Sequence, residues 1–225
     1  MKELADLILP RICPVCGEVL SGVEREMCLD CLSSLPFTHY WSYKDNPAEE
    51  LFWGKVYFER AASLFFYGDN SPYGHLIHKL KYNGREDIGV FLGKMLGRRL
   101  KESGLYSGVD AVIAIPVHPL KYWMRGYNQA GIIAKSVAGE LGVKVIRGVL
   151  TKRAFAKSQT TMDPEHRWKN AVSSFSLKKG LKVKGKHILL IDDVLTTGAT
   201  LEACGSLLLS VDGCRVSVAT LAFVE

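Results

Sequence analysis

Two adjacent acids followed by a hydroxyl-rich turn are the clearest chemical signal in this sequence. Asp192 and Asp193 directly follow the four apolar residues 188–191, and small or hydroxyl-bearing residues separate them from an apolar helical pattern. A phosphate in such a turn would meet the unpaired N–H groups and partial positive charge of a helix N-terminus. The residues of the turn that could contact this phosphate are Thr196, Thr197, Gly198 and Thr200.

The two acids need a partner of their own, because carboxylates beside a phosphate site repel the phosphate. They suit the neighbouring hydroxyls of a sugar, or a Mg²⁺ ion bound through water. The sequence therefore predicts a phosphorylated sugar as the ligand. A purely structural turn capped by an acid is the alternative, but capping does not explain two adjacent acids after four apolar residues. The Gly-x-x-x-x-Gly-Lys pattern of nucleoside triphosphatases is absent.

Four of the six cysteines form two Cys-x-x-Cys pairs separated by eleven residues. Two residues between ligands allow both thiolates of a tight turn to bind one ion, and four thiolates complete the tetrahedron that structural zinc prefers. The predicted zinc ligands are Cys13, Cys16, Cys28 and Cys31. Disulfide bonds are the competing interpretation, which the lack of a secretion signal disfavours. Residues 10–35 are too few to fold alone, so we expect the metal to hold them together.

Positive charge is concentrated in one stretch of the chain. The formal net charge is +6, but residues 144–187 alone carry twelve Lys or Arg and two acids, a local charge of +10. Such a stretch favours an anion of high charge density, either a polyphosphate or a nucleic-acid backbone. A solvated loop with lysines for solubility is the alternative. The long polar segment 151–170 within it is typical of a lid or a binding loop.

Apolar periodicity supplies the elements that would position these groups. Strand-like and helical patterns alternate along the chain; they lie at 56–67, 72–82, 87–102, 109–117, 128–141, 143–150, 187–192, 201–211 and 216–224. This alternation predicts an α/β fold with a doubly wound, mostly parallel sheet and helices on both faces. Ligands of such sheets bind at the carboxyl ends of the strands, where the two acids lie. Cys204 and Cys214 have no partner at ligand spacing and are expected to be buried core residues.

Composition limits the class of protein. The chain has 225 residues, of which 48% are hydrophobic and 23% charged, so intrinsic disorder is excluded. Its apolar runs are far shorter than the roughly 18 residues needed to cross a bilayer. The first nine residues contain acids and do not resemble a signal peptide. We therefore expect a cytoplasmic protein without a membrane span.

The run Ile-Asp-Asp-Val-Leu-Thr-Thr-Gly-Ala-Thr resembles the signature of type I phosphoribosyltransferases, which bind 5-phosphoribosyl-1-pyrophosphate (PRPP) with Mg²⁺. Nearly the whole chain resembles the ComF family: a four-cysteine zinc ribbon, Lys-Leu-Lys-Tyr-Asn-Gly at 79–84, Ile-Pro-Val-His at 115–118, Arg-Gly-Tyr-Asn-Gln at 125–129 and the phosphate loop. This resemblance implies that Asp192 and Asp193 are catalytic and face the ribose 2′ and 3′ hydroxyls. It further implies that the 5′-phosphate is held by Leu195, Thr196, Thr197, Gly198, Ala199 and Thr200.

Two further parts of the site follow from the resemblance. Pyrophosphate would bind at Pro116, Val117, His118 and Arg125. A mobile loop would close over PRPP and neutralise the departing pyrophosphate through Lys152, Arg153, Gln159 and Arg167. The same basic loop could instead lie along single-stranded nucleic acid, with Phe155 and Trp168 stacking on bases. The sequence does not decide between these roles.

The first functional hypothesis is a PRPP-binding phosphoribosyltransferase-like protein that transfers phosphoribose with Mg²⁺ and releases pyrophosphate. The alternative, which the resemblance also implies, is a single-stranded DNA-binding accessory protein of natural competence and DNA uptake. In that case the PRPP site would be regulatory, and other competence proteins would be partners. Fold analogy does not establish activity, so whether the chain is an enzyme stays open.

We expect two structural units. Residues 1–55 would form the zinc ribbon and a hood segment, and residues 56–225 the phosphoribosyltransferase-like α/β domain. Aromatic side chains are frequent at 37–53. They could stack on an acceptor base, or they could seal the ribbon against the sheet, and the second interpretation is favoured.

Overall fold

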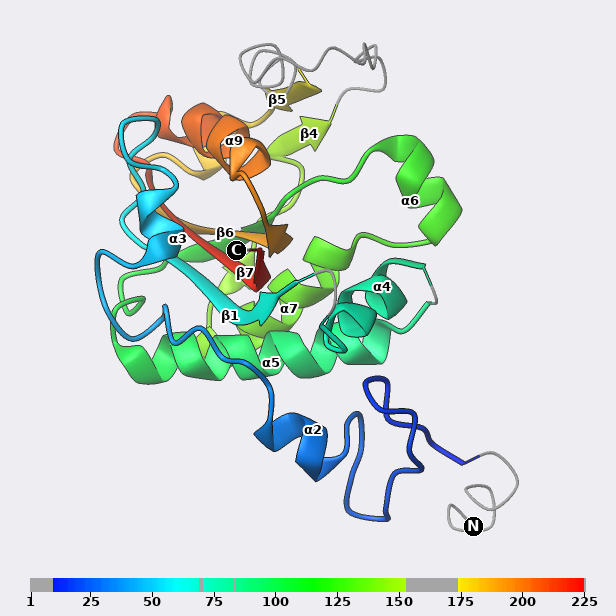
Figure 1. Cartoon of the computed structure of the whole chain (residues 1–225). Helices are drawn as coiled ribbons and strands as arrows, with labels where there is room; N and C mark the ends of the chain where they lie inside the picture. Colours follow the sequence, from blue (N-terminus) through cyan, green and yellow to red (C-terminus); the bar gives the residue numbers. More distant parts are fainter. Residues whose placement is uncertain (1–9, 69–70, 83, 153–173, 225) are drawn as a thin grey trace.

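Five parallel strands form the central sheet of the protein (Figure 1). The computed structural model describes residues 10–68, 71–82, 84–152 and 174–224. In spatial order the strands are β1 (Ala61–Tyr67), β7 (Arg215–Val224), β6 (His187–Leu195), β2 (Ala111–Ala114) and β3 (Lys144–Val145). Because the strands are parallel, their carboxyl ends meet at the same edge of the sheet.

Helices cover both faces of this sheet. The helices α5 (Glu86–Ser103) and α7 (Gln129–Leu141) lie on one face, and α9 (Ala199–Leu209) and the one-turn helix α3 (Pro47–Glu50) lie on the other (Figure 1). One core cluster joins α5 and α7 to the sheet, and a second joins α9 to the opposite face. The predicted α/β fold, with a parallel sheet and helices on both faces, is confirmed.

The central strands β6 and β7 are apolar because each lies between two strands and beneath helices on both faces. Residues 188–191 of β6 are completely buried. This strand is longer than predicted, because Val194 and Leu195 still pair with β7. Asp192, which was predicted to end the strand at 187–192, and Asp193, which was predicted to follow it, both lie within β6.

Several predicted strands are shorter in the structure. Residues 56–60 do not belong to β1, and β2 covers only four of the nine residues predicted at 109–117. The predicted strand at 143–150 is wrong as a single element. Its chain leaves the sheet after β3, turns at Gly148 with a φ of +73°, and continues as β4 (Leu150–Lys152), which pairs antiparallel with β5 (Phe175–Leu177). A glycine permits this left-handed conformation without strain.

The aromatic segment 37–53 is largely part of the core. Its buried aromatic side chains include Tyr40, Trp41 and Phe52, and its more exposed ones are Tyr43 and Trp53. Tyr40 packs edge-to-face on Phe66 of β1 and Phe223 of β7, with ring centroids 5.7 and 5.3 Å apart. These contacts agree with the interpretation of the segment as a hydrophobic seal. Cys204 and Cys214 are also buried, as expected.

The remaining elements lie around the sheet. The helices α2 (Leu29–Ser33) and α4 (Gly74–Tyr82) belong to the end of the molecule that carries the N-terminal segment (Figure 1). The helix α6 (Pro119–Arg125), which the sequence analysis did not predict, follows β2, and the 3-10 helix η1 (Gly180–Lys182) precedes β6. Within the described ranges, no helix is both long and apolar enough to cross a membrane.

The helices α5 and α7 approach each other closely at two glycines of α5. A Cβ atom added at Gly93 would lie 2.9 Å from the Cβ of Ser136 and 3.2 Å from the Cα of Ile133, both on α7. At Gly97 it would lie 3.0 Å from the Cα of Val137. The close spacing of the two helices therefore requires residues without a side chain at Gly93 and Gly97.

Substituting these glycines tests the packing. We expect Gly93→Ala to destabilise the fold by about 1–2 kcal/mol, because the backbone of α7 must move. The free-energy cost of this movement exceeds the gain in helix propensity from alanine. The control is Gly139→Ala on α7, where an added Cβ meets nothing within 4 Å, and which should stabilise the fold by up to about 1 kcal/mol. Urea denaturation measures both changes, and equal effects of the two variants would contradict the close packing.

Candidate functional site

A cavity of about 220 Å³ opens at the carboxyl ends of β6 and β2. Residues predicted from two distant parts of the sequence meet in it. From β6 and α9 come Asp192, Asp193 and Thr200, and from the other wall come Pro116, Val117, His118 and Arg125. Four polar lining residues were absent from the predicted site: Lys81, Lys121, Asn128 and Gln129. The structure thus joins the predicted diol-facing acids to the predicted pyrophosphate residues and adds polar groups from α4, α6 and α7.

The cavity contains more cations than carboxylates. Its two acids face four basic side chains, Lys81, Lys121, Arg125 and Lys152. The Nζ of Lys81 lies 3.2 Å from a carboxylate oxygen of Asp193, and both side chains are largely buried. Burial, and after it the nearby Lys121, lower the pKa of Lys152. Such an excess of cations suits a ligand with several negative charges.

Asp192 is the most strongly perturbed acid of the site. Burial, and after it the negative charge of Asp193, raise the pKa of Asp192 to about 7. The backbone N–H of Asp193 donates to the Asp192 carboxylate over 2.9 Å, which partly offsets this rise. The carboxyl therefore changes its charge near neutral pH, as groups at functional sites often do.

The loop after β2 is held by residues of α6 and α7. The side chain of His118 is the N-cap of α6 and accepts a hydrogen bond from the Leu120 N–H through Nδ1, over 3.2 Å. Asn128, at the start of α7, donates from Nδ2 to the carbonyl of Ile115 over 2.9 Å. With Nδ1 used as an acceptor, the proton of a neutral His118 ring lies on Nε2.

Arg125 is placed by contacts on two sides. One guanidinium nitrogen donates to the Oε1 of Gln129 over 3.1 Å, and another lies 3.4 Å from the Tyr82 hydroxyl. Its charge also lies 5.0 Å from the centre of the Tyr82 ring. These contacts hold a bidentate anion-binding group at the cavity wall.

Gln129 is a candidate binding residue that the sequence analysis quoted only as part of a motif. Its side chain is 3% exposed and lines the cavity, and its Nε2 has no hydrogen-bond partner among the described residues. A buried amide donor without a partner costs about 1–3 kcal/mol. An acceptor oxygen of a ligand in the cavity would remove this cost.

The predicted phosphate residues occupy different positions. Thr200 lines the cavity, Leu195 is 1% exposed and packs in the core, and Thr196 and Thr197 are exposed. Gly198 precedes α9 with a φ of +76°, and no side chain caps this helix. The first N–H groups of α9 are therefore not used by a capping side chain.

Only one of the four predicted loop residues can be located. Lys152, at the end of β4, lines the cavity, with its Nζ 4.8 Å from the centre of the Phe175 ring. Arg153, Gln159 and Arg167 lie outside the described residues. Their predicted contact with pyrophosphate stays a prediction.

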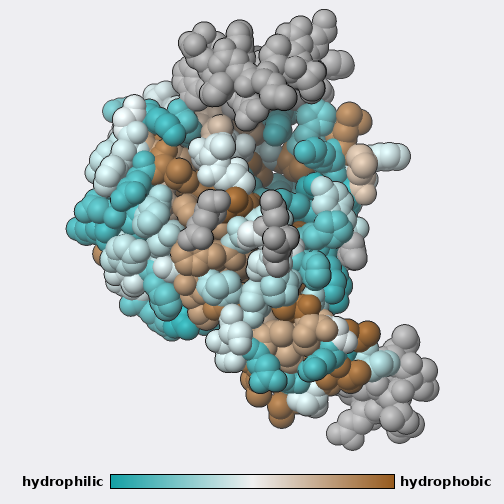
Figure 2. All heavy atoms as spheres, in the orientation of Figure 1, coloured by the Kyte–Doolittle hydropathy of each residue, from teal (hydrophilic) through white to brown (hydrophobic). Residues whose placement is uncertain are grey.

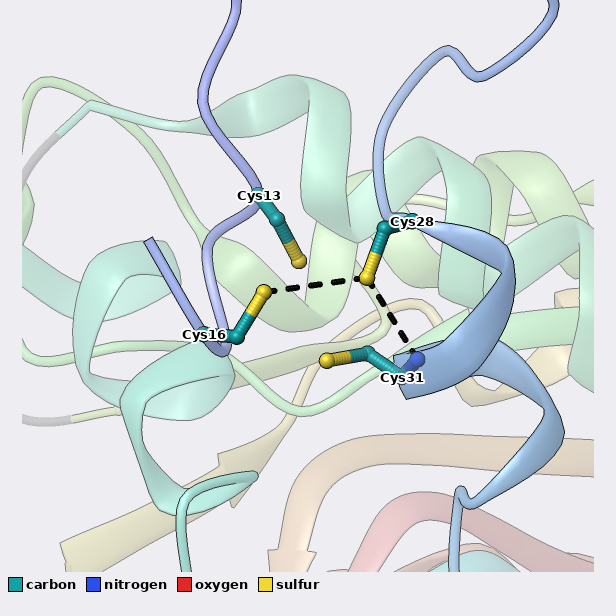
Figure 3. A group of neighbouring side chains, drawn as sticks. All are labelled: Cys13, Cys16, Cys28 and Cys31. Atoms are coloured by element: carbon teal, nitrogen blue, oxygen red, sulfur yellow. Dashed lines mark hydrogen bonds between the residues drawn. The ribbon is translucent and has the colours of Figure 1, made fainter. Parts of the chain in front are cut away.

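The four cysteines of the N-terminal segment form a second site. The sulfur atoms of Cys13, Cys16, Cys28 and Cys31 point toward a common centre (Figure 3), and their ligand atoms all lie within 4.8 Å of one another. The sulfurs of Cys16 and Cys28 are 3.7 Å apart. Four thiolates at about 2.3 Å from one zinc ion would be roughly 3.8 Å apart, so the arrangement fits tetrahedral zinc.

The electrostatics of the cluster also favour a cation. Burial, and after it the neighbouring thiols, raise the pKa of Cys31. A bound divalent ion reverses this effect, because it stabilises the thiolates that bind it. The four residues could therefore bind a metal ion, as predicted.

Comparison with known proteins gives a consistent set of matches. Residues 124–224 match the phosphoribosyl transferase domain family. The DNA utilization protein YhgH of Escherichia coli strain K12 is 26% identical over 210 residues, which cover 92% of this chain and 88% of that protein. Competence protein F of Haemophilus influenzae is 26% identical over 141 residues, which cover 61% of this chain and 62% of that protein. A crystal structure of an adenine phosphoribosyl transferase from Trypanosoma brucei is similar with a TM-score of 0.32 and 16% identity, covering 80% of this chain and 81% of that one.

The raised pKa of Asp192 predicts a pH-dependent stability. A carboxyl whose pKa is higher in the folded than in the unfolded chain stabilises the fold most below about pH 4, and this contribution is lost as the pH rises through about 7. The fold should therefore lose on the order of 2–3 kcal/mol between pH 5 and pH 8 relative to Asp192→Asn.

Urea denaturation of the two proteins across this pH range measures the difference. The control is Asp212→Asn, whose carboxylate is exposed and contacts Lys184. A parallel pH dependence of the parent and the Asp192→Asn variant would contradict the perturbed carboxyl.

Proposed function

Because the chain is a type I phosphoribosyltransferase-like protein of the ComF family, we propose that its cavity binds PRPP together with Mg²⁺. The observation that carries this proposal is the meeting of Asp192 and Asp193 with Arg125, Lys152 and the start of α9 around one cavity. A sugar with a phosphate at one end and a pyrophosphate at the other needs these three kinds of group together.

Each part of PRPP has a partner in the proposed complex. The carboxylates of Asp192 and Asp193 accept hydrogen bonds from the ribose 2′ and 3′ hydroxyls. The N–H groups at the start of α9, which has no side-chain cap among the described residues, and the hydroxyl of Thr200 bind the 5′-phosphate, with Leu195 to Ala199 forming the turn beneath it. The loop Pro116, Val117 and His118, with Arg125 and the buried Gln129 amide, binds pyrophosphate.

The proposed reaction is displacement of pyrophosphate from the anomeric carbon by a nucleophile. Mg²⁺, which Asp192 and Asp193 would hold through water, neutralises negative charge on the pyrophosphate when bound. The chain's own contribution is electrostatic: Lys81, Lys121 and Lys152 are fixed beside the leaving group before charge develops on it. The transition state gains from these cations, because the departing pyrophosphate carries more charge than the bound ester.

Structural zinc is the metal proposed for the four-cysteine cluster, because four thiolates at this spacing leave no open coordination position. A site built from thiolates requires reduced cysteines, which is consistent with the cytoplasm as the proposed location.

Calorimetry with PRPP tests the main proposal. The parent should bind PRPP in the presence of Mg²⁺, and the double variant Asp192→Asn/Asp193→Asn should bind at least about tenfold more weakly, because two charged acceptors for the ribose hydroxyls are lost. The exposed carboxylate of Asp212 supplies the control Asp212→Asn, which should bind like the parent. No binding by the parent, or binding that does not depend on Mg²⁺, would overturn the assignment.

A second candidate function, binding of single-stranded DNA, is favoured by the surface of α6. Four of its residues are exposed although they are apolar or aromatic: Leu120 is 66% exposed, Tyr122 52%, Trp123 85% and Met124 77%. The cations Lys121 and Arg125 alternate with them along the helix. Figure 2 shows brown atoms beside teal ones at the position of α6, on the right of the view.

Rings and cations interleaved in this way suit the bases and phosphates of a single strand. The relatives named for DNA utilization and competence agree with this role. Other competence proteins are further proposed partners, because exposed aromatic side chains also serve protein interfaces.

The second candidate is tested with a labelled single-stranded oligonucleotide of about 20 nucleotides. Trp123→Ala should weaken binding about tenfold without changing its salt dependence, because a ring is lost and no phosphate contact is removed. Lys121→Met should instead reduce the slope of the logarithm of the binding constant against the logarithm of salt concentration.

The control is Tyr57→Ala, which removes a 73% exposed ring that does not line the cavity. Equal binding by Trp123→Ala and the parent would exclude α6 as the DNA surface. Competition by PRPP separates the two functions: DNA binding that PRPP does not displace, and that survives Asp192→Ala, supports an independent DNA site.

A further inference from the structure

The helix α4 contacts both sites of the molecule. It lies between the N-terminal segment and α6 (Figure 1). Tyr73, directly before the helix, and Lys79, in its last turn, meet the four-cysteine segment, and Lys81 meets the cavity at the end of β6. The motif Lys-Leu-Lys-Tyr-Asn-Gly at 79–84 supplies residues to both contacts, but only the fold shows which site each residue reaches.

Two hydrogen bonds attach α4 to the backbone of the cysteine knuckles. The Nζ of Lys79 donates to the carbonyl of Pro14, which lies between Cys13 and Cys16, over 2.9 Å. The hydroxyl of Tyr73, directly before α4, donates to the carbonyl of Cys31 over 3.0 Å. Both acceptors are therefore in or beside a metal ligand.

Apolar contacts support the same attachment. The buried side chains of Leu76, Ile77 and Leu80 on α4 share one core cluster with Leu20 and Met27 of the N-terminal segment. The cysteine segment and α4 are therefore parts of the same apolar core.

The last two residues of α4 place groups at the cavity. Lys81 forms the ion pair with Asp193, and Tyr82 lies against the guanidinium of Arg125. The carbonyl of Leu80 accepts a hydrogen bond from the Tyr127 hydroxyl over 2.5 Å. Lys79 and Lys81 are two residues apart, so a shift of the helix at the first moves the second.

The helix α4 cannot hold this position by itself. It has nine residues, and helices shorter than about 12–15 residues are marginal in water without tertiary contacts. The cysteine segment is equally unable to fold without its metal, because it is short and has few apolar residues. Loss of the metal therefore removes one of the surfaces on which α4 depends.

We infer that the four-cysteine metal centre sets the anion affinity of the cavity through α4, with Lys79 as the positioning residue that connects them. Metal occupancy fixes the Pro14 and Cys31 carbonyls, these fix α4, and α4 fixes Lys81 and Tyr82 beside Asp193 and Arg125. The PRPP part of this inference rests on the proposed function, whereas the effect on α4 does not.

The test uses the full-length, metal-loaded protein and compares Lys79→Met, Lys79→Arg and Lys101→Met. The methionine keeps the apolar stem of Lys79 and removes the donor to Pro14, and the arginine retains a donor. Lys101 is an exposed lysine at the end of α5 and serves as the control. Three quantities are measured: bound zinc, amide hydrogen exchange of residues 74–82, and the Kd for PRPP with Mg²⁺.

With one zinc still bound, the α4 amide hydrogens of Lys79→Met should exchange about tenfold faster than those of the parent. The Kd for PRPP should rise about fivefold. Lys79→Arg should recover most of both effects, and Lys101→Met should match the parent. Removal of zinc from the parent with a chelator should increase α4 exchange further, while the amides of β6 and β7 stay protected.

Two results would overturn the inference: unchanged α4 exchange in Lys79→Met and after zinc removal, or a faster exchange accompanied by an unchanged Kd for PRPP. If the metal-loaded parent does not bind PRPP, the proposed function fails. The exchange measurements then still decide whether α4 depends on the metal.

Discussion

Two adjacent carboxylates at the end of one buried strand repel each other, and their negative charge must be balanced by cations from other parts of the molecule. Asp192 and Asp193 are adjacent, and burial with mutual repulsion raises the pKa of the first to about 7. Positive charges from three separate elements line the same cavity as these acids: Lys81 of α4, Lys121 of α6 and Lys152 of β4. The strand order places the end of β2, with its loop and α6, directly beside these acids. A polyanion can enter because the cations outnumber the acids.

The turn that connects β6 to α9 depends on the N-terminal half of the chain. Gly198 has a left-handed backbone, and an added Cβ would lie 2.7 Å from the Phe52 ring. Glycine therefore satisfies two requirements at once, since it allows the φ value and leaves room for the ring. Phe58 approaches Gly205 of α9 in the same way. Phe52 and Phe58 thus support the candidate phosphate site by packing against the turn and against α9.

The sequence predicted the structure best where the signal depends on residues that are close together in the chain. The run of acids and threonines, the Cys-x-x-Cys pairs and the alternation of strands and helices each depend on neighbouring residues, and the fold class and cysteine cluster were found as predicted. The cavity residues Lys81, Lys121 and Gln129 were missed, because their role depends on long-range packing that brings α4, α6 and α7 to one place. Lys81 and Gln129 stand in the motifs at 79–84 and 125–129, but a motif alone does not show that its residues line the same cavity.

Errors in the strand and helix boundaries have equally local causes. The apolar residues at 143–150 read as one strand, but Gly148 turns the chain out of the sheet. The helix α6 has no buried residue, so its sequence lacks the periodic apolar pattern that predicts a helix. Its exposed rings are instead a surface feature, which only the structure makes visible.

The order of strands in the sheet has a consequence for synthesis of the chain. β7 is translated after both of its neighbours, yet it lies between β1 and β6. Until residues 215–224 leave the ribosome, those two strands have apolar, unpaired edges that can associate with other chains. A chain that ends before residue 215 would keep both edges unpaired and would be prone to aggregate.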